Sequence, residues 1–145
     1  MKKIKLIALI LLFIAASLSI AFILKIEFPR GFEAYFKREY YNQFGPLVIS
    51  VELLIASYYL FIGHEKTNFA LALFGSTALL DPIFNQLGIF ESVMPLYGTI
   101  ISSICGLFCL WLAFANSFEL KRLSRLLGLL SLILGVLVEL FFNYT

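Results

Sequence analysis

The sequence predicts an all-α membrane protein, a bundle of five transmembrane helices with one amphipathic helix on the outer surface. Two runs carry no charge, from Leu6 to Leu24 and from Ser92 to Phe118. Each is long enough to supply the about 20 apolar residues that cross the hydrocarbon core as a helix. Three further apolar runs are each interrupted by one acid, and these acids are Glu52, Asp81 and Glu139.

Composition supports the same class. The 145 residues are 61% hydrophobic and 14% charged, whereas a soluble domain is about 45–50% apolar and about 25% charged. This excess of apolar residues leaves no room for a soluble domain, so we expect residues 1–145 to form one integral membrane domain. The net charge of +2 does not indicate a nucleic-acid-binding surface.

The first transmembrane helix is expected over residues 4–26. Its basic start and apolar continuation are also typical of a signal peptide. The uncharged run of 19 residues from Leu6 to Leu24 is longer than the about 7–15 residues of a signal-peptide core, so we favour an uncleaved helix. A four-helix bundle is the alternative, with this segment removed or the third segment re-entrant.

The next segment is predicted to be an amphipathic helix over residues 29–42, lying in the headgroup plane on the outer side. Phe28, Phe32 and Phe36 recur at helical spacing, and Glu33 and Lys37 form a favourable pair four residues apart. An apolar face opposite a charged face is typical of an interfacial helix. Two roles stay open for it: a membrane-surface connector, or a lid that docks a partner over the bundle.

The second and third transmembrane helices are expected over residues 46–63 and 68–84. The third contains Pro82 directly after Asp81. Because a residue before proline is pushed away from helical angles, we expect this helix to break at Asp81-Pro82. Asp81 would then cap a short further helix that ends at Gly88.

The fourth and fifth transmembrane helices are expected over residues 94–116 and 125–142. Small residues spaced by three or four positions lie on one face of the fourth helix, and such spacing lets helices approach closely in lipid. We interpret this face either as packing within one bundle or as the seam of a homodimer. The predicted packing face consists of Gly98, Ser102, Gly106 and Cys109.

Lysine and arginine predict the orientation, because cytoplasmic loops carry an excess of them. A cytoplasmic N-terminus places Lys2, Lys3, Lys5, Lys66, Lys121, Arg122 and Arg125 inside and only Lys25, Arg30, Lys37 and Arg38 outside. We therefore expect an integral protein of the cell inner membrane with a cytoplasmic N-terminus and an outer C-terminus.

The three intramembrane acids form the candidate site. Counted along their helices, they lie roughly 6–9 Å below the outer end of the bundle at about 1.5 Å per residue. Intramembrane acids usually face the bundle interior and are functional candidates. The candidate pocket residues are Glu52, Asp81, Asn85 and Glu139, and the candidate charge partners are Arg30, Lys37 and Arg38.

Three interpretations of these acids stay open. They line an outward-open pocket for a cation, a proton or a basic head group, in which repulsion between close carboxylates would leave at least one protonated. Alternatively, they pair with the basic residues and hold the surface helix on the bundle. In the third interpretation, each acid reaches water by itself.

Familiar catalytic motifs are absent from the sequence. It has one histidine, His64, and no phosphate-binding loop, nucleophile elbow or zinc-protease motif. We therefore expect no metal and no cofactor, and we favour a non-enzymatic protein. It would be an accessory subunit of a membrane complex, or a binder of a small lipophilic molecule in an acid-lined outer-leaflet pocket.

Two alternative functions remain. One is a small proton- or cation-coupled transporter that uses the intramembrane acids. The other is a membrane enzyme that acts on lipid or quinone. The expected partners are the lipid bilayer and either another membrane protein or a second copy of the chain; nucleic acid is not expected.

Overall fold

The computed structural model is all-helical over the part of the chain that it describes, which confirms the all-α part of the predicted class. It describes residues 2–28, 30–37, 40, 43–89, 95–115 and 124–143, with side chains up to residue 141. The elements are α1 (Lys2–Leu24), the 3-10 helix η1 (Phe32–Phe36), α3 (Gly45–Ile62), α4 (Thr67–Gln86), α5 (Leu96–Ala115) and α6 (Arg125–Asn143).

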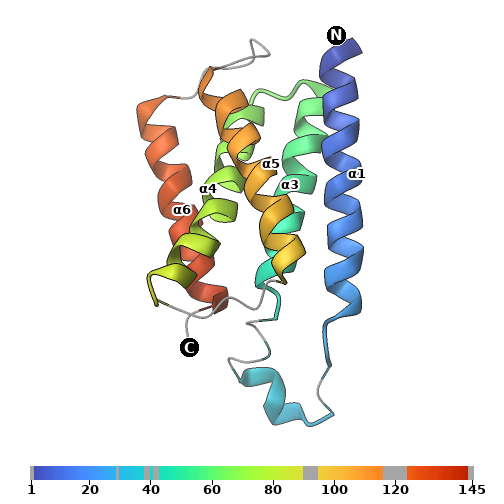
Figure 1. Cartoon of the computed structure of the whole chain (residues 1–145), viewed down its shortest axis with the longest axis vertical. Helices are drawn as coiled ribbons and strands as arrows, with labels where there is room; N and C mark the ends of the chain where they lie inside the picture. The colour runs from blue at the N-terminus through green and yellow to red at the C-terminus, as the bar shows by residue number, and fades with distance from the viewer. Residues whose placement is uncertain are drawn as a thin grey trace.

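The five long helices lie side by side and alternate in direction (Figure 1). Four of them, α1, α3, α4 and α5, are long and apolar enough to cross a membrane by length and composition. α1 packs against α3, and α4 contacts α3, α5 and α6. α4 is the least apolar of the four and the most buried. Its position between three other helices explains this composition, because a helix that is packed on several sides by protein can carry more polar residues.

Small residues set the distances between α4 and its neighbours. A Cβ atom added at Gly106 of α5 would lie 3.2 Å from Ala78 Cβ of α4, and one added at Gly135 of α6 would lie 3.2 Å from Thr77 Oγ1. All four residues of the predicted packing face are buried in α5. The stripe of small side chains therefore lies at a close contact between helices of one chain.

Glycines end α3 and α4. Gly63 and Gly88 have φ angles of 69° and 76°, the left-handed conformation that glycine adopts without steric cost. After each glycine, the next amide bonds back into the helix: His64 N–H donates to the Tyr59 carbonyl at 2.9 Å, and Ile89 N–H donates to the Phe84 carbonyl at 3.0 Å. This pairing is the Schellman arrangement, and it stops both helices where the sequence predicted.

Substituting Gly63 with alanine is expected to lower the free energy of unfolding by about 1–2 kcal/mol, the cost of a left-handed conformation for a residue with a Cβ atom. Unfolding in a denaturing-detergent titration would measure it. Gly31→Ala is the matched control, because Gly31 has a φ of −94° and no described atom lies within 4 Å of an added Cβ. Equal losses in both variants would contradict the argument.

The predicted break at Asp81-Pro82 is wrong, because α4 continues through both residues to Gln86. Pro82 lacks one amide hydrogen, but the following turn stays bonded, with Leu87 N–H donating to the Ile83 carbonyl at 3.0 Å. Neighbouring side chains bury this part of α4, so an opened turn would leave buried backbone groups without partners, and helix continuation is favoured. Asp81 is therefore a residue inside the helix, with its side chain buried, and it does not cap a new helix.

The predicted surface helix over residues 29–42 is interrupted. Phe32–Phe36 form a 3-10 helix, Lys37 ends it in an extended conformation, and the chain is helical again at Tyr40. The segment is held instead by local contacts: the Gln43 side-chain amide bonds the backbone N–H and carbonyl of Glu27 at 2.9 and 3.0 Å. This contact joins the two ends of the connection, which lies beyond the ends of α1 and α3 (Figure 1). Residues 29, 38, 39, 41 and 42 lie outside the described residues.

Candidate functional site

The three intramembrane acids come from three different helices. Glu52 belongs to α3, Asp81 to α4 and Glu139 to α6. Asp81 and Glu139 are 2% and 1% exposed, and Glu52 is partly buried. A long charged side chain is almost never fully buried without a partner, so the surroundings of Asp81 and Glu139 decide what they do.

Asp81 and Glu139 meet at the contact between α4 and α6. Their carboxyl groups interact through a side-chain hydrogen bond, and Glu52 lies within electrostatic range of Glu139. The structure thus brings all three acids into one region of the bundle interior. The two most buried acids touch each other directly, which sequence spacing alone could not establish.

Glu52 has a different environment from the other two acids. The Thr77 hydroxyl of α4 lies beside its carboxyl group and donates its one hydrogen to the Leu73 carbonyl at 2.9 Å. The second carboxyl oxygen of Glu52, Oε2, is buried and has no hydrogen-bond partner among the described residues. An acceptor in this state costs free energy, so Glu52 is the natural place to look for a bound proton or water.

The other predicted site residues are exposed where the structure describes their side chains. Asn85 is one helical turn beyond Asp81 on α4 and is exposed, as are Arg30 and Lys37 in the connection between α1 and α3. Arg38 and the side chain of Asn143 lie outside the described residues. The electrostatic neighbours of Glu139 are the acids Asp81 and Glu52. An ion pair between the acids and the surface segment remains a prediction.

The donor geometry disfavours a metal ion at this cluster. Within the described ranges, no group of three or more His, Cys, Asp or Glu side chains is placed to hold one. Cys105 and Cys109 are free thiols buried in α5. The three acids share a region without converging on a single point.

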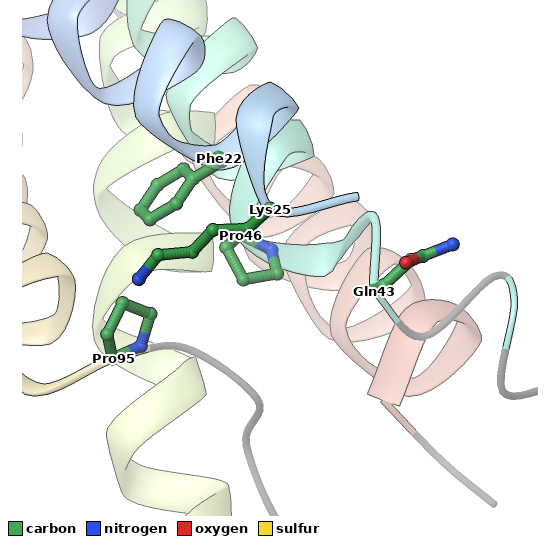
Figure 2. A pocket seen from close by; sticks show the side chains of 5 residues that line it. All are labelled: Phe22, Lys25, Gln43, Pro46 and Pro95. Atoms are coloured by element: carbon green, nitrogen blue, oxygen red, sulfur yellow. The ribbon is translucent and has the colours of Figure 1, made fainter. Parts of the chain in front are cut away.

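A cavity of about 190 Å³ lies elsewhere, at the end of the bundle where α1 ends and where α3 and α5 begin. Its lining residues are Phe22, Lys25, Gln43, Pro46 and Pro95 (Figure 2). None of these residues is acidic, so the acid-lined pocket remains a prediction. Pro46 and Pro95 stand at the starts of α3 and α5, and their separation in the sequence gave no signal that both would line a cavity beside α1.

Comparisons of the chain with protein-family models, with curated proteins and with solved structures gave no match.

Proposed function

We propose that the chain is an integral membrane protein in which all five long helices cross the bilayer, with the N-terminus cytoplasmic. α6 has 19 residues, about 28 Å of helix at about 1.5 Å per residue, which is close to the thickness of the hydrocarbon core. It packs alongside α4, which itself is apolar enough to span. The lysine and arginine asymmetry of the loops supports the orientation.

We further propose that this membrane protein is a small proton-coupled carrier, and that Asp81 and Glu139 bind the coupling proton. The observation that carries the proposal is that these two buried carboxyl groups interact with each other at the contact between α4 and α6. Two ionised carboxylates are acceptors only, whereas a protonated one supplies a donor. The observed contact therefore corresponds to a pair that holds at least one proton.

The composition of the cluster supports a proton over the other predicted ligands. A metal ion would need several converging ligands, and no such group is present among the described residues. A proton needs only the two carboxyl groups that meet.

The position of the pair links its protonation to helix packing. α6 contacts mainly α4, with a smaller contact to α3, and the carboxyl pair lies at the α4–α6 contact. A shared proton holds the two helices together, whereas two negative charges in a medium of low dielectric constant repel each other strongly. Loss of the proton would therefore loosen α6, and such a coupled movement is what a carrier requires.

The test is an infrared difference spectrum of the purified protein between acidic and alkaline pH. We expect a protonated-carboxyl C=O band that is lost in Glu139→Gln and Asp81→Asn. The Glu65→Gln variant should retain the band, because Glu65 is exposed in the turn between α3 and α4. An unchanged band in both cluster variants would show that the pair does not bind the proton.

The same variants, reconstituted in liposomes that contain a pH-sensitive dye, separate a carrier from an accessory subunit. A carrier moves protons in response to an imposed gradient, and we expect at least a tenfold loss of the rate in Glu139→Gln. A wild-type rate equal to that of empty liposomes, together with stoichiometric co-purification of a larger membrane protein, would replace the carrier with the accessory subunit.

A further inference from the structure

The cavity at the end of α1 has the features of a binding site that is separate from the three acids. Phe22 and Lys25 of the α1 end form one side, and Pro46 and Pro95, at the starts of α3 and α5, form the other (Figure 2). Phe22 is buried and stacks on Tyr97 of α5, with ring centroids 6.4 Å apart. Phe22, Pro46 and Pro95 thus form an apolar and rigid part of the wall, since proline and a stacked ring have little freedom to move, and Gln43 adds a neutral polar side chain.

Lys25 supplies the single charge of the cavity lining. Its Nζ lies 4.9 Å from the centroid of the Tyr97 ring, and the side chain runs across the cavity toward Pro95 (Figure 2). The aromatic face orients the ammonium group but neutralises none of its charge. In the part of the chain that the structure describes, Lys25 forms no ion pair with a carboxylate. The ammonium group is therefore free to donate to an anion.

The depth of the cavity in the membrane follows from the sequence of α1. The uncharged run ends at Leu24 and Lys25 is the next residue, so the cavity lies where hydrocarbon gives way to headgroups. Lysine at such a helix end extends its amine toward the interface. The first turns of α3 and α5 also point amide groups and a partial positive charge in this direction.

We propose that this cavity binds the phosphate of an anionic phospholipid headgroup, with Lys25 as the charged ligand and Phe22, Pro46 and Pro95 in contact with the glycerol and upper acyl region. The cavity suits such a lipid because one cationic side chain, Lys25, lies beside the apolar side chains of Phe22, Pro46 and Pro95 at the expected depth of the headgroups. It requires the proposed membrane embedding but not the proposed proton coupling. A phospholipid presents a phosphate attached to apolar chains, whereas free phosphate would leave the apolar walls uncovered.

The test is native mass spectrometry of the purified full chain, titrated in detergent with phosphatidylglycerol or phosphatidylcholine. We expect wild-type protein to retain phosphatidylglycerol preferentially. Lys25→Gln should weaken this retention about tenfold or more, the scale of one lost hydrogen bond to a charged group. Lys37→Gln is the matched control, because Lys37 is exposed near the same end of the bundle but does not line the cavity.

Three outcomes would overturn the proposal. The first is equal weakening in Lys25→Gln and Lys37→Gln, which would indicate attraction to surface charge in general. The second is equal retention of the two lipids. The third is competition by inorganic phosphate alone at the same concentration as the lipid, which would assign the cavity to a free anion. Asp81→Asn should leave lipid retention unchanged, so failure of the proton proposal would be seen separately.

Discussion

Substituting Gly75 with alanine is expected to destabilise the bundle by about 1–3 kcal/mol, the cost of overpacking a close contact, and Gly75→Val is expected to cost more. A Cβ atom at Gly75 would lie 2.6 Å from Leu110 Cγ and 2.8 Å from the Gly106 carbonyl oxygen. Leu110 can change rotamer, but the carbonyl belongs to the α5 backbone and moves only with that helix. Unfolding in a denaturing-detergent titration measures the loss.

The glycines of the bundle offer a graded control for this prediction. A Cβ at Gly106 would meet Ala78 Cβ at 3.2 Å, so Gly106→Ala should cost less than Gly75→Ala. Gly31→Ala should cost least, because its surroundings are open within the described structure. Losses that do not follow this order would show that α4 and α5 can separate freely and that their contact does not limit stability.

Substituting Glu52 with methionine is expected to stabilise the bundle by about 1–3 kcal/mol, the cost of a buried polar atom without a partner. The Oε2 atom of Glu52 is such an atom among the described residues, and methionine fills a similar volume with a flexible apolar chain. The free energy of unfolding, measured by the same titration, should rise. A decrease in the free energy of unfolding would show that the contacts of the Glu52 carboxyl group, such as that with Thr77, stabilise the bundle by more than its buried oxygen destabilises it.

Two variants complete the test of Glu52. Glu52→Gln keeps a polar group at the same place and should give no such gain. Asp81→Leu should instead destabilise the bundle by about 1–3 kcal/mol, because it removes the partner of the buried Glu139 carboxyl group. We therefore expect the free energy of unfolding to rise in Glu52→Met and to fall in Asp81→Leu. This difference would show that Glu52 has a buried oxygen without a partner, whereas Asp81 stabilises the bundle through its contact with Glu139.

The sequence predicted the helices closely because each one is encoded locally. The helices are indicated by long runs without charged residues. A proline lies near the start of α3, and a glycine follows the end of α3 and of α4. Each of these signals acts within one or two helical turns. Two local rules failed. Pro82 did not break α4, because neighbouring helices bury this part of α4 and an open turn would leave buried backbone groups without partners. The aromatic spacing of residues 28–36 produced only a short 3-10 helix.

By itself, the sequence determined the all-helical class, the apolar lengths and the presence of three acids at similar depth. Depth follows from counting residues along a helix, which one chain segment fixes alone. Only the tertiary structure decided that Asp81 meets Glu139, that Glu52 stands beside Thr77, and that Lys25 lies over Tyr97. These contacts depend on how each helix is rotated and which helix is its neighbour, and both follow from packing between segments distant in the chain.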